Sequence, residues 1–372
     1  MQTNHRPCSR LRRVAMAALA FVAIGATTVA CRVPKSYEVT THQTDLQNPW
    51  EVAFLGDGTM FVTERPGDIG VRRTNGTFQR FNRPSNVVAA GEGGMMGLAI
   101  DPGYASNSRI YTCYMTANDV RVVRWNVNLG NTTLGSPQDL VTGIPRASNG
   151  RHSGCRLAFA PNSNALWVTT GDAASCNNPQ NLGSLGGKVL RVDTNNGGAA
   201  AGNMTISGQL SRIYAYGFRN PQGLSFRPSD GRPFLVEHGP DRDDEITPLT
   251  AGGNGGWAPG CGYNEGVPMT NFNLGNNVLA PFWQSGSPTI APSGADFVTD
   301  SDWGDFRGRL VVAVLKGQQL RLFNVADGST DAGSPIVTGY GRLRTAVEGP
   351  DGRLYVATDA NPGRILAVQP VL

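Results

Sequence analysis

NPWEVAFLGDGTMFVTE, residues 48–64, is the stretch that decides the fold. An apolar run reaches a D-G turn, and a run of β-branched and aromatic residues follows the turn at once. A D-G turn between two such runs is the strongest short-range signal for a β-hairpin. The same order of run, turn and run returns in the rest of the chain. The further copies lie at 97–115, 155–172, 223–239, 306–325 and 345–359.

The spacing of these hairpin units predicts a ring of blades. Successive units start roughly fifty residues apart, which suits four-stranded blades joined by irregular loops. Glycine is abundant, with 48 of 372 residues, and no helical heptad appears. We therefore expect an all-β fold, a six-bladed β-propeller of four-stranded antiparallel blades. Closure of the ring would bring SYEVTTHQT, residues 36–44, beside the last blade. A β-sandwich is the alternative, but it does not explain similar hairpins at this spacing.

The first 30 residues have the composition of an export signal. Four arginines form a basic segment, and VAMAALAFVAIGATTVA follows as an apolar run of signal-peptide length. The run ends in TTVAC, which predicts a lipoprotein-type signal peptide at 1–30 and a lipid on Cys31. Plain secretion and a single transmembrane anchor are the alternatives. We expect a tether at 31–44 and the propeller at 45–372, exported to the periplasm or cell surface and joined to the membrane only through the lipid.

The net positive charge of the chain comes from the predicted signal peptide. Removing residues 1–30 takes away four arginines and no acidic residue, so the formal net charge falls from +4 to 0. No basic stripe remains to indicate binding of nucleic acid. No GxGxxG opening a helix, P-loop or GxSxG elbow occurs, which disfavours nicotinamide, nucleotide and serine-hydrolase functions.

The cysteines of the mature propeller indicate disulfides. Cys113, Cys155, Cys176 and Cys261 are an even set in a chain that we expect to be exported. Two disulfides are therefore favoured over metal binding. Four cysteines allow three pairings, among which we favour 113–155 and 176–261.

A histidine and an aspartate bracket the third hairpin. His152 precedes it in NGRHSGC, and Asp172 ends it in VTTGDAA. Because a hairpin returns its end beside its start, Asp172 can reach the imidazole and fix its tautomer. A carboxylate behind an imidazole orients a general base. Taken singly, such residues are more often a surface histidine and a turn-capping aspartate. His238, the other histidine near a turn, is expected only to shape its loop.

The segment GFRNPQGLSFRPSDGRPFLVEHGPDRDDE, residues 217–245, combines opposite charges. It joins the pair Arg219–Asn220 to an acidic turn rich in proline and glycine. Such a unit places a cationic side chain beside backbone carbonyls and carboxylates. This arrangement suits an anionic cofactor bridged to the protein by a hard cation such as calcium.

Three further cations stand in apolar surroundings. Lys316, one of only three lysines, lies within RLVVAVLKGQQLRLF. Arg342 and Arg344 alternate, so on a strand they share one face and need anions there. The simpler alternatives are an exposed lysine at a strand end and an exposed edge strand.

Together these segments resemble the soluble quinoprotein glucose/sorbosone dehydrogenase family, which includes aldose sugar dehydrogenases that use pyrroloquinoline quinone (PQQ). The resemblance covers roughly residues 45–370, and its motifs are weak singly but specific in this order. They are GEGGMMGLAIDP, RHSGCRLAFAP, GDAASCNNPQNLGSLGGKVLRVD, GFRNPQGL, EHGPDRDDEI, VVAVLKGQQL and GRLRTAVEGPDGRLYVATD.

The resemblance implies a role for each matched residue. His152 would be the general base, Asp172 its orienting partner, and Arg219 would offset negative charge on the quinone. The residues that would bind PQQ are Glu92, Asn220, Lys316, Arg342 and Arg344. The residues that would bind calcium are Gly239 and Pro240 beside PQQ, and Glu245, Glu265 and backbone oxygens near Cys261 and Tyr263 at a second site. Two positions depart from some family members: Glu92 replaces a glutamine, and Gly255 replaces an aromatic residue.

The activity implied is oxidation of an aldose at its anomeric carbon to a lactone, with hydride transfer to the quinone. A non-catalytic binding platform and a calcium-dependent lactonase are the alternatives. The cations Lys316, Arg342 and Arg344 distinguish a PQQ-dependent dehydrogenase from a lactonase. A lactonase does not bind a tricarboxylate and therefore does not need them. The sequence identifies neither the sugar nor the electron acceptor.

Overall fold

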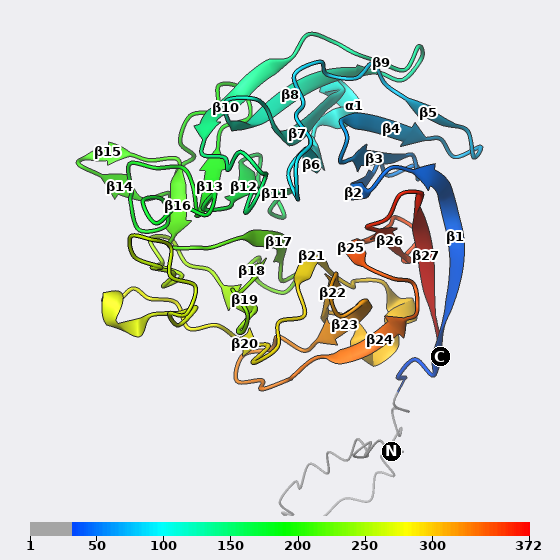
Figure 1. Cartoon of the computed structure of the whole chain (residues 1–372). Helices are drawn as coiled ribbons and strands as arrows, with labels where there is room; N and C mark the ends of the chain where they lie inside the picture. Colours follow the sequence, from blue (N-terminus) through cyan, green and yellow to red (C-terminus); the bar gives the residue numbers. More distant parts are fainter. Residues whose placement is uncertain (1–31) are drawn as a thin grey trace, which may run out of the picture.

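The computed structural model describes residues 32–372, in which six antiparallel sheets surround a common centre (Figure 1). Each sheet contains a path of four strands, so the six-bladed propeller expected from the hairpin spacing is confirmed. The expected signal peptide and Cys31 lie outside the described residues. None of the helices in the described part is long and apolar enough to cross a membrane.

The first three blades follow the chain in order. Blade 1 has the strands β2 (Pro49–Phe54), β3 (Met60–Glu64), β4 (Asp68–Arg72) and β5 (Phe78–Arg80). Blade 2 has β6 (Met95–Ile100), β7 (Arg109–Met115), β8 (Val120–Asn128) and β10 (Gln138–Ile144), with the short β9 (Thr133–Leu134) paired to β8. Blade 3 has β11 (Gly154–Phe159), β12 (Leu166–Thr170), β13 (Lys188–Val192) and β16 (Ile213–Tyr216).

The other three blades complete the ring. Blade 4 has β17 (Pro221–Phe226), β18 (Pro233–Glu237), β19 (Glu245–Pro248) and β20 (Trp283–Gln284). Blade 5 has β21 (Pro292–Phe297), β22 (Leu310–Val314), β23 (Gln319–Phe323) and β24 (Ser334–Thr338). Blade 6 has β25 (Leu343–Glu348), β26 (Leu354–Thr358), β27 (Gly363–Val371) and β1 (Ser36–Leu46). The remaining elements are a hairpin of β14 (Thr205–Ile206) and β15 (Gln209–Leu210) and the helices α1 (Tyr104–Asn107), η1 (Phe272–Leu274) and η2 (Ser301–Phe306).

The two ends of the chain close the ring in blade 6. β1 pairs antiparallel with β27, from Ser36 opposite Val371 to Leu46 opposite Gly363 (Figure 1). The expected position of residues 36–44 beside the last blade is therefore confirmed. The domain boundary expected at residue 45 moves to Ser36, because these residues form the outer strand of a blade. Only residues 32–35 of the expected tether lie before that strand in the described part.

Five of the six predicted hairpins are the two innermost strands of a blade, and one differs. In blade 5 the quoted hairpin at 306–325 corresponds to β22 and β23, which pair from Leu310–Phe323 to Val314–Gln319. The innermost strand there is β21, PSGADF, which pairs with β22. Its serine, glycine and aspartate interrupt the apolar pattern, so no strand was predicted there.

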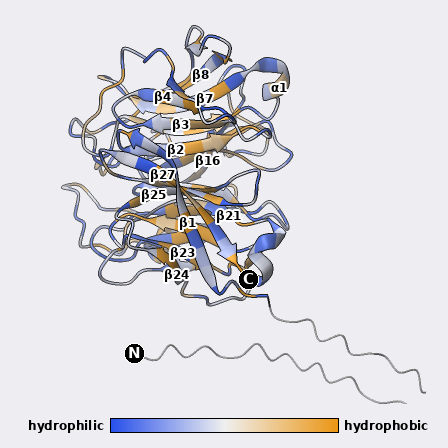
Figure 2. Cartoon of the chain, turned by 90° about the vertical axis from the view of Figure 1, so that its right-hand side faces the viewer, coloured by the Kyte–Doolittle hydropathy of each residue, from blue (hydrophilic) through white to orange (hydrophobic). Residues whose placement is uncertain are grey.

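The core lies between neighbouring blades, which cover both faces of each sheet. The second strands of blades 1, 3, 4, 5 and 6 are buried at every residue, as in MFVTE of β3 and LVVAV of β22. Continuous rather than alternating apolar runs follow from burial on both faces. In Figure 2 hydrophobic and hydrophilic segments both occur along the strands and along the loops.

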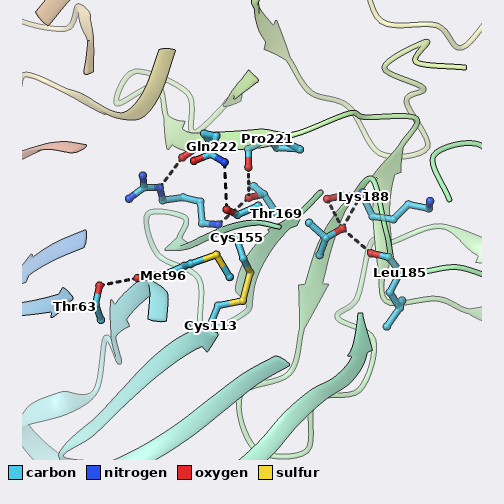
Figure 3. The surroundings of a disulfide bond; sticks show 12 residues. Thr63, Met96, Cys113, Cys155, Thr169, Leu185, Lys188, Pro221 and Gln222 are labelled. Atoms are coloured by element: carbon cyan, nitrogen blue, oxygen red, sulfur yellow. Dashed lines mark hydrogen bonds between the residues drawn. A yellow bond between two sulfur atoms is a disulfide. The ribbon is translucent and has the colours of Figure 1, made fainter. Parts of the chain in front are cut away.

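One of the two expected disulfides is present. Cys113 of β7 is bonded to Cys155 of β11, so the bond ties blade 2 to blade 3 within the core (Figure 3). The other expected pair is not bonded in this structure: Cys176 and Cys261 are free thiols on two loops. Among the cysteines of residues 32–372, the bonded pair is the one whose two strands lie in neighbouring blades of the core.

Candidate active site

The innermost strands bring their starts together at one end of the propeller. Each innermost strand has a register shift against the second strand near its first residues. Such bulges redirect the side chains next to them. Glu92, His152 and Asn220 come shortly before three innermost strands, and Asp172 and Gly239 follow shortly after two second strands. Hairpin pairing therefore places residues from distant parts of the sequence at the same end.

A cavity of about 300 Å³ lies among these residues. It is lined by Glu92, Arg151, His152, Arg219, Asn220, His238, Gly239, Pro240, Asp244, Thr289 and Ala291. Six of the site residues expected from the sequence are in this lining. The structure thus assembles half of the expected catalytic and cofactor-binding residues, together with the expected calcium ligands Gly239 and Pro240, around one space.

His152 and Asp172 form the predicted pair. The imidazole Nδ1 lies 2.8 Å from Oδ1 of Asp172, and the side chains are 5% and 0% exposed. A carboxylate accepts hydrogen bonds, so Nδ1 carries the proton and Nε2 of the neutral ring is the basic nitrogen. His152 has a φ of 53°, and its backbone N–H donates to the carboxylate of Glu92. Hydrogen bonds therefore hold both the backbone and the side chain of His152.

Two aromatic residues that the sequence did not assign to the catalytic pair complete the surroundings of Asp172. Trp257 Nε1 donates to Oδ2 of Asp172 at 2.8 Å, and the Tyr263 hydroxyl donates to the same oxygen at 2.7 Å. That hydroxyl is also 2.9 Å from Nδ1 of His152. Burial, followed by the charge of Asp172, raises the pKa of Tyr263, so it remains a donor. Both residues come from an irregular loop, where no periodic pattern marks them.

Arg219 lies beside this pair in a buried position, 5% exposed. Its backbone N–H donates to Glu237 at 3.0 Å, and Nη1 donates to the carbonyl of His238 at 3.1 Å. Nη2 forms an ion pair with Glu265, which also pairs with Arg151. Burial alone would raise the pKa of Glu265, but its hydrogen bonds to the two arginines outweigh burial and lower it. Glu265 is therefore an anion that screens Arg219.

Arg344 reaches the same end through Gln222. Its Nη1 donates to Oε1 of Gln222 at 3.0 Å, and Nε2 of Gln222 donates to Glu92 at 3.0 Å. Its Nη2 forms an ion pair with Asp359 at 2.9 Å, and Arg342 approaches the same carboxylate at 3.4 Å. Asp359 is thus the anion expected between the two arginines. Arg344 is buried, whereas Arg342 is exposed.

Lys316 and Asn220 contact residues of the cavity lining. Lys316 is exposed, and its Nζ donates to the hydroxyl of Thr289 at 3.3 Å. Asn220 Nδ2 donates to Glu92 at 2.9 Å, so Glu92 accepts hydrogen bonds from Asn220, Gln222 and the backbone of His152. Glu92 therefore organises this part of the site and contributes a negative charge to it.

The residues around the cavity fit an anionic cofactor. Buried nitrogen atoms without a hydrogen-bond partner in the described part of the chain include Nε of Arg219, Nε of Arg344 and Nε2 of His238. Burial, with Arg344 and Arg219, lowers the pKa of His238 to about 3, so its ring is neutral. Arg219 and His238 line the cavity, and an unpartnered guanidinium donor in such a place suits a ligand with carboxylates or carbonyls.

The expected calcium ligands divide into two places. Gly239 and Pro240 line the cavity next to Asp244, whose buried carboxylate accepts from the Gly239 N–H at 3.0 Å. Glu245 instead lies opposite Glu237 across β18 and β19. Within residues 32–372, no group of three or more His, Cys, Asp or Glu side chains is arranged to hold a metal.

Glu237 and Glu245 form a buried carboxylate pair, each 1% exposed. Each has one oxygen that lacks a hydrogen-bond partner among the residues described. Burial raises the pKa of Glu245 to about 7 and, together with Glu245, raises that of Glu237. Two facing carboxylates of this kind can share one proton or bind a cation between them. Glu265, expected beside Glu245, is paired with Arg219 and Arg151, and Tyr263 directs its hydroxyl to His152.

Comparison with known proteins places this geometry in a family. The model of the family described as glucose/sorbosone dehydrogenase matches residues 46–367. The chain is 30% identical to aldose sugar dehydrogenase YliI of Escherichia coli (strain K12), over 91% of this chain and 94% of that protein. The PQQ-bound form of aldose sugar dehydrogenase from Streptomyces coelicolor has a TM-score of 0.77 and 30% identity, over 91% of this chain and 99% of that chain. The apo-form of soluble aldose sugar dehydrogenase from Escherichia coli has a TM-score of 0.80 and 27% identity, over 90% and 100%. The chain with this buried His152–Asp172 pair belongs to the glucose/sorbosone dehydrogenase family.

Proposed function

We propose that the protein is a PQQ- and calcium-dependent dehydrogenase that oxidises aldose sugars at the anomeric carbon to lactones. The single observation that carries this proposal is the buried His152–Asp172 pair at a cavity that Arg219 also lines. A base of this kind and a group of cations are both needed when a hydroxyl is deprotonated next to an anionic cofactor. The family match supports sugar oxidation as the general reaction.

PQQ, when bound, supplies an electrophilic quinone carbonyl that accepts the hydride from the anomeric carbon. Asn220, Lys316, Arg342 and Arg344 would hold its carboxylates and carbonyls. The fit rests on the unpartnered Nε of Arg219 and on the cavity of about 300 Å³ that Arg219 and Asn220 line. Lys316 reaches this lining through Thr289, and Arg344 reaches it through Gln222 and Glu92. The PQQ-bound relative from Streptomyces coelicolor supports the same cofactor.

His152 removes the proton from the anomeric hydroxyl through Nε2. Asp172 keeps the other nitrogen protonated and stabilises the imidazolium that forms. Trp257 and Tyr263 hold Asp172 in place through its second oxygen. Arg219 offsets negative charge that develops on an oxygen near its guanidinium. Loss of the proton and the hydride converts the cyclic hemiacetal to a lactone.

Calcium would be held by the backbone carbonyls of Gly239 and Pro240, which are hard oxygen ligands of the type that calcium prefers. A second cation at Glu245 would neutralise the facing carboxylate of Glu237. We further propose that the chain is exported and carries a lipid on Cys31. The electron acceptor would then meet the protein outside the cytoplasm.

The test is reconstitution of purified protein with PQQ and calcium, followed by dye reduction across a panel of aldoses. We expect activity only with both additions, and loss of about 10²–10⁴-fold in kcat in His152→Ala. His42→Ala is the matched control, since His42 lies on the outer strand β1 and packs against Tyr355. Full turnover in His152→Ala at saturating PQQ and calcium would contradict the role of the base. Lactone hydrolysis without PQQ would favour the lactonase, and neither activity would favour a binding platform.

A further inference from the structure

Two loops close together over the catalytic pair. The first follows β12 and runs from Asp172 to the start of β13, and the second is the long connection after β19 that carries Trp257 and Tyr263. Both Trp257 and Tyr263 donate to Asp172. Farther along the first loop, Nε2 of Gln180 donates to the carbonyl of Trp257 and to Oδ1 of Asn254, each at 2.9 Å. The loops are therefore joined at two places.

The two free cysteines lie between these contacts. Cys176 is located between Asp172 and Gln180 on the first loop, and Cys261 is located between Trp257 and Tyr263 on the second. Hydrogen bonds between the two loops therefore lie on either side of both cysteines: Trp257 and Tyr263 donate to Asp172 before them, and Gln180 donates to the Trp257 carbonyl beyond them. Cys261 is exposed and Cys176 is partly exposed, so both are open to small oxidants.

The other cysteine pair has the opposite surroundings. Cys113 and Cys155 are bonded and 0% exposed, and they belong to a hydrophobic cluster between blades 2 and 3. A buried disulfide is protected from thiol reagents, whereas one on exposed loops exchanges readily. The chain thus contains one structural pair and one pair placed for reversible chemistry.

We propose that Cys176 and Cys261 are a redox modification site whose substrate is a disulfide oxidant, such as a low-molecular-weight disulfide or an oxidised dithiol protein. A thiolate of the pair attacks the oxidant and forms a mixed disulfide, and the other cysteine then displaces the remaining oxidant thiol. The pair loses two electrons and two protons, and the oxidant disulfide is reduced to two thiols. The new bond ties the loop of Tyr263 to the loop of Asp172.

The bond fixes the groups that hold the carboxylate. Cys261 is only two residues from Tyr263 and four from Trp257, so the bond limits how far either can move from Asp172. In the reduced protein the loops remain joined only by hydrogen bonds and can open more often. The expected effect on turnover rests on the proposed function, whereas bond formation and loop opening do not. We expect reduction to lower kcat by about three- to tenfold with PQQ binding unchanged.

The experiment compares full-length mature protein treated with oxidised glutathione or with a mild thiol reductant. Peptide mapping by mass spectrometry should find a Cys176–Cys261 bond only after oxidation, while Cys113–Cys155 persists in both samples as an internal control. Hydrogen–deuterium exchange of residues 256–265 should be slower in the oxidised sample. Cys176→Ser and Cys261→Ser should each remove both effects.

Several results would overturn the inference. Stable glutathione adducts on each cysteine, dimers linked through Cys261, or no intramolecular bond would exclude the site. A mapped bond that leaves exchange of 256–265 unchanged would exclude the effect on the loop. Neither readout needs turnover, so an inactive protein that forms the bond and slows exchange would contradict the proposed function and not the redox site.

Discussion

Replacement of Asp172 by asparagine turns one carboxylate oxygen into an NH2 group, although both oxygens accept hydrogen bonds. The carboxylate accepts from Nδ1 of His152 and the N–H of Ala174 on one oxygen, and from Trp257 and Tyr263 on the other. An amide keeps one oxygen, so only two of these four donors retain an acceptor. The Asp172→Asn variant is therefore expected to lose both stability and catalytic geometry.

The magnitude follows from the two possible orientations of the amide. If its oxygen faces His152, the N–H of Trp257 remains buried without a partner, at a cost of about 1–3 kcal/mol. If its NH2 faces His152, Nδ1 must accept and the proton moves to Nε2, which removes the base. Either orientation also removes the charge that stabilises the imidazolium. We expect kcat to fall by about 10²–10⁴-fold, equivalent to about 3–5 kcal/mol of activation free energy.

The assay is dye reduction at saturating PQQ and calcium, together with urea unfolding. Asp296→Asn is a suitable control, because the partly buried Asp296 accepts from Ser225 and two backbone N–H groups away from His152. That control should lose stability and retain kcat. The reasoning is refuted if Asp172→Asn keeps kcat within about threefold of the wild type, or if Asp296→Asn loses as much activity.

Three other predictions concern cofactor binding, pH and the disulfide. Lys316→Ala should weaken PQQ binding by about 10- to 100-fold with little change in kcat at saturation, because a charge-assisted contact is worth about 1.5–3 kcal/mol; fluorescence titration measures it, and an unchanged Kd would exclude the contact. Lys188 is 0% exposed and donates to three carbonyls, and burial lowers its pKa to about 7. The unfolded chain then binds the proton that the folded chain releases, so stability should rise with pH from about 7 to about 10, and Lys188→Met should abolish this slope in urea unfolding. Cys113→Ala with Cys155→Ala should cost about 2–4 kcal/mol of unfolding free energy, and a cost near zero would contradict a structural role.

Local sequence signals were sufficient to predict the blades. The hairpin at 48–64 and its copies contain their own turns and apolar runs, and such signals act between neighbours in the chain. The ring closure was also accessible, since the count and spacing of units left residues 36–44 to complete the last blade. β21 was missed because PSGADF is ordered by its neighbouring strands rather than by its own pattern.

Motifs and hairpin geometry in the sequence were enough to predict the six-bladed fold, the His152–Asp172 pair and the cationic residues expected to face an anionic ligand. A hairpin brings its own ends together, so that pair needed no tertiary information. The folded arrangement was needed to find that Trp257 and Tyr263 complete the surroundings of Asp172 and that Glu265 pairs with Arg219. These contacts join loops of different blades, and their distances depend on how the blades close into a ring, which no local pattern encodes.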